Sequence, residues 1–84
     1  MKIRSALKSD KEIIFDMLNY NKFDFSISLN DFENIYNSNY IDFNVILYKN
    51  IRIGVVFQKK VFVNPLYWEK IDIDKIKKLL GREI

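Results

Sequence analysis

Two β-type runs separated by only two residues constrain this chain more than any other feature. Ile41 to Tyr48 and Ile51 to Gln58 are rich in β-branched and aromatic residues, and Lys49-Asn50 lies between them. Such a gap predicts a tight hairpin. Gln58-Lys59-Lys60 then turns the chain into a third strand, which begins at Val61. We therefore expect an antiparallel sheet in the second half of the chain.

Amphipathic stretches before these strands predict two helices. The first follows Ser9-Asp-Lys-Glu12, which has the form of a capping box, and its apolar residues recur at helical spacing: Ile13, Ile14, Met17 and Leu18. A second capping box at Asn30-Asp-Phe-Glu33 predicts a short helix through Tyr36.

A final helix is expected from about Asp72 to Leu80. Asp72 or Asp74 is the expected N-cap, and Gly81 is the expected C-terminal stop. The apolar residues Ile73, Ile76, Leu79 and Leu80 are expected to face the sheet, with Lys75, Lys77 and Lys78 largely on the opposite side.

The remaining runs complete a β-α-α-β-β-β-α order. Met1 to Leu7 alternates apolar and polar residues and predicts a first strand. Lys22 to Leu29 alternates in the same way, and is either a strand or an extended loop that places aromatic residues on the core. The fold class is therefore α+β: a mostly antiparallel sheet with helices packed on it, with residues 1–84 forming a single domain.

Composition excludes several kinds of chemistry. The chain contains neither cysteine nor histidine, so disulfides, Cys or His metal sites, and nucleophile systems that need histidine are ruled out. Apolar runs are shorter than the about 20 residues that span a bilayer, and the N-terminus is too charged for a signal peptide. We expect a cytoplasmic protein. Its abundant Ile, Asn, Lys, Tyr and Phe suggest an AT-rich bacterial or phage genome.

Charge is distributed unevenly along the chain. Residues 1–48 contain five Lys or Arg and seven Asp or Glu, a net charge of −2, whereas residues 49–84 contain nine and four, a net charge of +5. A basic half of this kind attracts polyanions or acidic partners. The candidate nucleic-acid-binding residues are Lys49, Arg52, Lys59, Lys60, Lys70, Lys75, Lys77, Lys78 and Arg82. The alternative is a solvated helix face with lysines that protect hairpin tips from pairing.

Aromatic residues lie near these cations in the sequence. Phe57 and Phe62 are interpreted as core residues, while Tyr67 and Trp68 follow Pro65 at a strand end and are candidates for stacking on bases or for contact with a partner. Asp72 and Asp74 are interpreted as helix caps rather than metal ligands, because no third ligand is in view. No catalytic residue is predicted.

The element order resembles the N-terminal half of the GNAT N-acetyltransferase fold. The segments that carry this resemblance are Ile3 to Ala6 with the Ser9-Asp10 helix start, Ile53 to Val56, and Val61 to Tyr67 (VFVNPLY). In that family a basic residue and a glycine-rich loop follow this tyrosine. Bare backbone amides there, together with the helix dipole, hold the pyrophosphate of acyl-CoA.

This chain departs from the family at that loop. Trp68 stands where the basic residue is expected, Ile71 and Ile73 stand where glycines are expected, and Glu69 and Asp72 add negative charge. β-Branched side chains obstruct the close approach that glycine permits. The sequence also ends after this helix, so the later strand and helix of the family do not follow. We therefore expect that acetyl-CoA binding is lost and that the protein needs no cofactor.

The leading prediction is a small non-catalytic binding protein, of the accessory or phage-inhibitor kind. Its basic half would engage RNA or another nucleic acid, with or without a protein target. One alternative is a truncated GNAT-like domain that binds acyl-CoA, and another is an inhibitor whose lysines meet an acidic protein. Self-association through an exposed sheet edge is also predicted, because open edges invite pairing.

Overall fold

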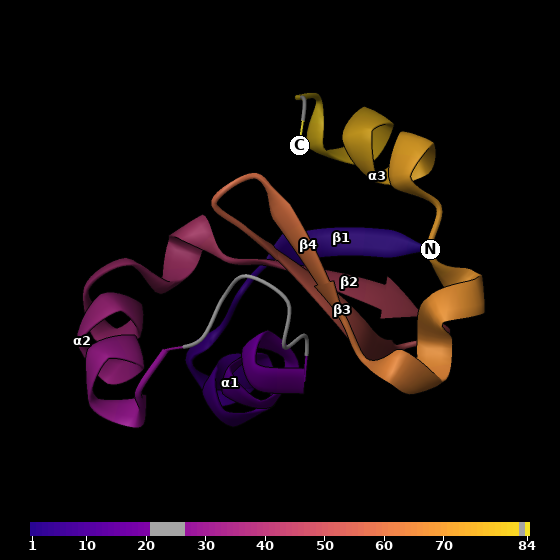
Figure 1. Ribbon diagram of the computed structural model, residues 1–84. Helices are drawn as coiled ribbons and strands as arrows, with labels where there is room; N and C mark the ends of the chain where they lie inside the picture. The colour runs from indigo at the N-terminus through magenta and orange to yellow at the C-terminus, as the bar shows by residue number, and fades with distance from the viewer. Residues whose placement is uncertain (21–26, 83) are drawn as a thin grey trace.

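The computed structural model of the protein describes residues 1–20, 27–82 and 84. Within these residues one sheet contains β1 (Lys2–Ser5), β2 (Asn44–Tyr48), β3 (Ile51–Phe57) and β4 (Lys60–Val63), in that order and all antiparallel (Figure 1). Helices α1 (Lys11–Tyr20) and α2 (Leu29–Asn39) precede β2, and α3 (Ile73–Leu80) follows β4. The predicted α+β class and element order are confirmed. Most of the Lys22–Leu29 run, residues 22–26, lies outside the described residues.

The sheet separates the helices into two layers. Helices α1 and α2 cover one face, while α3 and the 3₁₀ turn η3 (Pro65–Lys70) cover the other (Figure 1). Successive residues of a strand point to opposite faces. Accordingly Val45 and Val55 join the core under α1 and α2, whereas Ile46 and Val56 join the core under α3. No helix among the described residues is long and apolar enough to cross a membrane.

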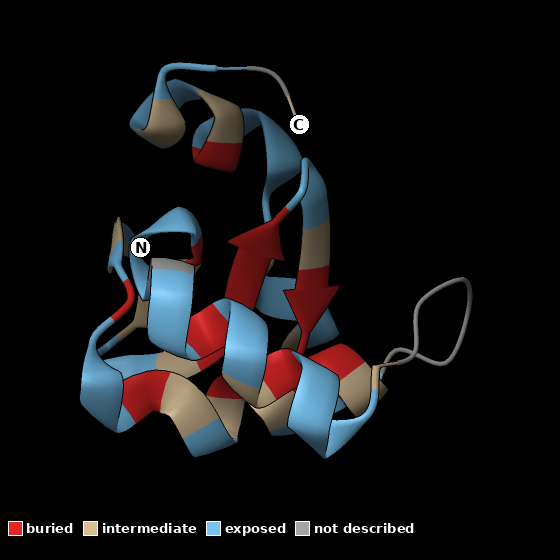
Figure 2. Cartoon of the chain, turned by 90° about the vertical axis from the view of Figure 1, so that its left-hand side faces the viewer, coloured by how far each residue is buried: buried red, intermediate tan, exposed pale blue. Residues whose placement is uncertain are grey.

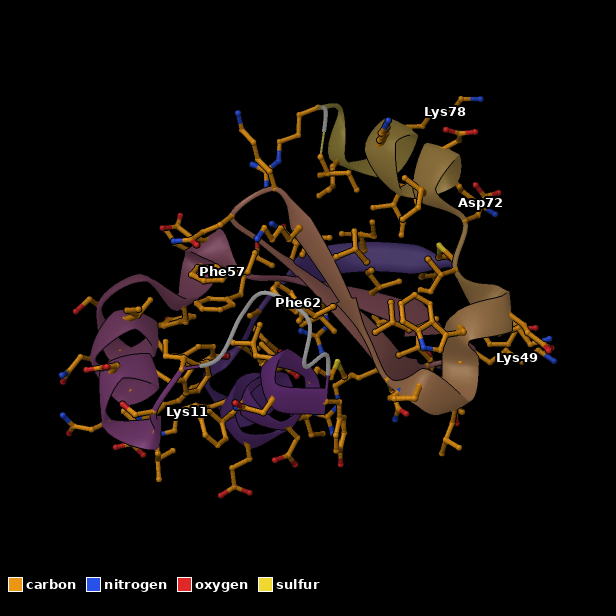
Figure 3. All side chains as sticks on the ribbon, in the orientation of Figure 1. Lys11, Lys49, Phe57, Phe62, Asp72 and Lys78 are labelled. Carbon is orange, nitrogen blue, oxygen red and sulfur yellow. The ribbon has the colours of Figure 1, made fainter. Side chains whose placement is uncertain are left out.

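Aromatic side chains fill the core under α1 and α2. Phe43 and Phe57 stack with ring centroids 4.2 Å apart and planes 7° apart, and Phe32 packs beside Phe43 at 6.0 Å. Phe57 and Phe62 are 6% and 4% exposed, so their interpretation as core residues is confirmed. Figure 3 shows both on the side of the sheet that carries α1 and α2.

The core under α3 is smaller. Ile76 is the buried residue of α3, and Leu80 packs partly buried against the same cluster. Ile73 and Leu79 are 42% and 48% exposed, so the prediction that they face the sheet is wrong. An eight-residue helix reaches the sheet through a narrow stripe, which leaves its other apolar positions in solvent. Figure 2 accordingly shows α3 with little buried surface.

The first two helices begin differently from the prediction. The 3₁₀ turn η1 (Lys8–Asp10) precedes α1, and the carboxylate that reaches back is that of Asp10, which accepts a bond from the Leu7 amide at 2.7 Å, rather than that of Glu12. Helix α2 is capped by Ser28, whose Oγ accepts from the Asp31 amide at 3.1 Å, rather than by Asn30. Ser28 to Asp31 fits the capping pattern as well as Asn30 to Glu33 does, and the two differ by half a turn.

Two predicted strands are shorter than expected. The 3₁₀ turn η2 (Tyr40–Asp42) occupies the start of the Ile41–Tyr48 run, so β2 begins only at Asn44. The first strand ends at Ser5, and Leu7 beyond it is 52% exposed. Its amide donates to Asp10 and its carbonyl accepts from Tyr36, so the backbone of Leu7 is engaged away from the sheet.

Both hairpins have two-residue turns of the mirror-image type. Lys49 and Asn50 have φ values of 50° and 66°, and Gln58 and Lys59 have φ values of 52° and 62°. Positive φ at both central residues defines the type I′ turn, whose twist matches that of the flanking strands. The hairpin predicted from the Lys49-Asn50 gap is confirmed.

Candidate nucleic-acid interface

Seven of the nine predicted cations lie on α3 or beside the segments that flank it. Lys75, Lys77 and Lys78 lie on the helix itself, and Lys70 lies in η3 just before it. Lys49 approaches the same ring as Lys70, and Lys59 and Arg82 line one groove beside the segment after the helix. We call these seven residues the basic band. All are exposed except Lys77, which is half-buried. Figure 3 shows Lys78 on the side of the sheet opposite Lys11 of α1.

Lys49 and Lys70 approach the same aromatic ring. Their Nζ atoms lie 5.5 Å and 5.4 Å from the centroid of Tyr48, the last residue of β2. A cation over a tyrosine face gains about 0.5–1 kcal/mol at an exposed site. The ring thus brings together a lysine from the β2–β3 turn and a lysine from η3, which are 21 positions apart in the sequence.

Local signals fix the position of the α3 lysines. Asp72 Oδ1 accepts from the Lys75 amide at 3.1 Å, and Gly81 ends the helix in the left-handed region at φ 70°, with its amide donating to Lys77 O at 2.8 Å. The predicted caps at both ends are therefore confirmed. Lys75 and Lys78 are three residues apart and lie beside each other on the exposed helix surface.

Arg52 and Lys60, the other two predicted cations, point to the face of the sheet that carries α1 and α2. Lys60 pairs with Phe57, whose ring belongs to the core on that face. A β-bulge between β2 and β3 pairs Ile46 with Gly54 but Leu47 with Arg52, so Ile53 is the extra residue. Cross-strand partners share a face, and Leu47 packs on the α1 side. There Arg52 Nη1 lies 3.0 Å from Asp10 Oδ1.

The partner of Arg52 is a buried carboxylate that the sequence did not single out. Asp10 has no exposed surface, and it accepts bonds from Arg4 at 2.7 and 3.2 Å, from the Leu7 amide at 2.7 Å, and from Arg52. Burial alone would raise the pKa of Asp10, but these hydrogen bonds outweigh it and lower the pKa to about 2. This cluster joins β1, η1 and β3, and its role is structural.

A second buried group completes that cluster. The Tyr36 hydroxyl of α2 donates to the carbonyl of Leu7. Burial, reinforced by the nearby charge of Asp10, raises the pKa of Tyr36 to about 12. Neither contact could be predicted from a local sequence pattern, because Tyr36 lies 29 residues from Leu7 and Arg52 lies 42 residues from Asp10.

The two candidate stacking residues differ in exposure. Tyr67 is partly buried against the core under α3, whereas Trp68 is 52% exposed. Both belong to η3, which begins where the Asn64 side chain accepts from the Leu66 amide at 3.1 Å. Trp68 is therefore the residue of the pair with a ring surface open to a ligand, two positions from Lys70.

Charge is partitioned across the sheet as well as along the sequence. Helices α1 and α2 contain Glu12, Asp16, Asp31 and Glu33 against the single cation Lys11. Among the described residues, ion pairs are formed by Arg4, Arg52 and Lys11, all on that same side. The basic band on the other side also has acidic neighbours, namely Glu69, Asp72 and Asp74.

Within the described part of the chain, no three His, Cys, Asp or Glu residues gather as metal ligands would.

Comparison with known protein families, with curated proteins and with solved structures finds no match to this chain.

Proposed function

We propose that this protein is a small, non-catalytic nucleic-acid-binding protein that engages RNA through the basic band. The observation that carries the proposal is the presence of seven cations on α3 or beside its flanking segments. Lys49, Lys70, Lys75 and Lys78 form no ion pair with any described residue, so their charge is available to phosphates. A surface of this kind gives salt-dependent affinity for a polyanion.

Trp68 supports RNA over a purely electrostatic partner. Its half-exposed ring stands in the same short turn as Lys70. Single-stranded RNA offers unstacked bases, and stacking one base on an aromatic side chain contributes about 1–3 kcal/mol. We leave Arg52 out of the interface because its guanidinium is bonded to Asp10 on the opposite face.

The start of α3 supports a binding role over an acyl-CoA-dependent reaction. The amide of Lys75, which a pyrophosphate at this helix terminus would need, already donates to Asp72 Oδ1. Asp72 and Asp74 also place two carboxylates in the first turn and its cap, where they repel an anion. We therefore propose that the resemblance to the GNAT fold extends to the order of helices and strands but not to the binding of acyl-CoA.

Purification in low salt tests this function. The protein should carry nucleic acid, seen as an elevated 260/280 nm absorbance ratio that high salt removes. Digestion of that material by ribonuclease, but not by deoxyribonuclease, identifies it as RNA. A preparation free of nucleic acid that also fails to bind added RNA contradicts the proposal. Concentration-dependent thermal stabilisation by acetyl-CoA, without RNA binding, would favour the acyl-CoA alternative instead.

A further inference from the structure

A groove of about 670 Å³ lies at the end of the sheet beside the β3–β4 turn. Five parts of the chain contribute to it: the end of β1, the C-terminal half of α2 with η2, the start of β2, the end of β3 with the β3–β4 turn, and the segment after α3. Its size fits one nucleotide, since small-molecule sites are typically about 300–1,000 Å³. The residues used below are Ile35, Ile41, Asp42, Asn44, Lys59 and Arg82.

The groove is lined by charged side chains of both signs. Lys59 and Arg82 line it together with Asp42, yet none of the three forms an ion pair with a described residue. Arg82 is held by its amide, which donates to Lys77 O at 3.3 Å in the C-terminal cap of α3. Lys59 is fixed at the tip of a type I′ turn. Cations and a carboxylate are therefore presented from separate elements to a shared space.

Apolar surface lies between these charges. Ile41 is 64% exposed and Ile35 is 36% exposed, although both are large aliphatic residues. Phe57 also lines the groove, but its ring stacks on Phe43 and belongs to the core. The two isoleucines thus form an apolar surface in the groove, and the cations and the carboxylate lie around it.

We propose that this groove binds one guanosine nucleotide of a single-stranded RNA. Lys59 and Arg82 contact its phosphate, and the isoleucines contact the base. The carboxylate of Asp42 accepts from N1–H and N2–H of guanine, two donors on one edge, while Asn44 adds a polar contact. Uracil presents a single donor flanked by two carbonyl oxygens, which a carboxylate repels. The inference rests on the proposed function, because Lys59 and Arg82 belong to the basic band.

The test compares single-stranded RNA hexamers, one composed only of uridine and one with a single central guanosine. The protein should bind the guanosine hexamer about tenfold more tightly, which corresponds to one good bidentate base contact. Asp42→Asn, which replaces one acceptor by a donor, should reduce the preference to near unity. Asp16→Asn is the matched control, because it makes the same charge change at an exposed position of α1 outside the groove. It should keep the preference.

A further variant separates the phosphate contact from the base contact. Lys59→Gln should weaken binding of both hexamers alike and leave their ratio unchanged. Equal affinity of the two hexamers for the unmodified protein, or a preference that Asp42→Asn leaves intact, overturns the guanosine site while the proposed function stands. Absence of binding to either hexamer overturns both.

Discussion

At the scale of single residues, Asp10 is the most consequential side chain of the fold. Its carboxylate has no exposed surface and joins Arg4, Arg52 and the Leu7 amide. Sequence reasoning did not single out this residue and assigned Arg52 to the nucleic-acid surface. No local pattern identifies a pair separated by 42 residues. Features that depend on neighbouring residues were predicted correctly: Asp72 and Gly81 cap α3, as their residue types indicate.

Acid should destabilise the protein through Asp10. Because the pKa of Asp10 is lowered from 3.8 to about 2 in the folded state, its contribution is complete above pH 4 and is lost as the pH falls through 2. The free energy of unfolding should lose about 2 kcal/mol from this group across that interval. The measurement is urea denaturation at several pH values, for the unmodified protein and for Asp10→Asn.

Asp10→Asn should be destabilised at pH 7, by about 3 kcal/mol, because two arginines lose their buried partner. The difference in unfolding free energy between the two proteins should shrink as the pH is lowered from 4 to 2. A difference that stays constant over this range would show that Asp10 is not the group responsible.

At the scale of elements, the bulge in β3 decides which face each neighbouring residue occupies. Without the extra residue at Ile53, alternation would send Arg52 toward α3 and Ile53 toward α1. The sequence predicted the strand and its hairpin but not the bulge, because the almost continuous apolar run of β3 does not specify which residues face which side. Gly54, the residue beside the bulge, lies close to the neighbouring strand.

Gly54→Ala should destabilise the sheet by about 1–3 kcal/mol. A Cβ atom at this position would lie 3.0 Å from the carbonyl oxygen of Phe62 and 3.2 Å from Cδ1 of Ile46. The carbonyl belongs to the backbone of β4, so strands must shift to admit the methyl group. Gly81→Ala is the comparison, since a Cβ there meets nothing within 4 Å and only the φ of 70° is unfavourable, at a cost of about 1 kcal/mol. Thermal denaturation that shows Gly54→Ala to be harmless would contradict the close approach of β3 and β4.

A substitution in the β2–β3 turn should instead stabilise the protein. Asn50 is the second central residue of a type I′ turn, with φ 66°, a position where glycine is preferred. Asn50→Gly should raise the free energy of unfolding by about 0.5 kcal/mol, because glycine adopts this conformation without steric cost. Chemical denaturation of the variant measures this, and a loss of stability would argue against the type I′ geometry.

At the scale of the whole molecule, α1 and α2 on one face of the sheet contain more acidic than basic residues, while α3 on the other face contains three lysines and one aspartate. This difference between the helices follows from the charge asymmetry along the sequence, because α1 and α2 precede the hairpin and α3 follows it. The exposure of Ile73 and Leu79 was not predicted, since periodicity gives the orientation of a helix but not the width of its contact. The groove beside the β3–β4 turn was not predicted either, because its lining residues come from five separate parts of the chain.

The salt dependence of RNA binding tests most directly whether the α3 side of the molecule contacts phosphates. Affinity for single-stranded RNA should fall linearly on log–log axes between about 50 and 200 mM salt, with about 0.7 units of slope for each phosphate contact. Lys75→Gln with Lys78→Gln should reduce that slope by about 1.4. Lys2→Gln with Lys8→Gln, two exposed cations in β1 and η1, should leave it unchanged. Binding that does not respond to salt, or an equal reduction by both pairs, would contradict the account.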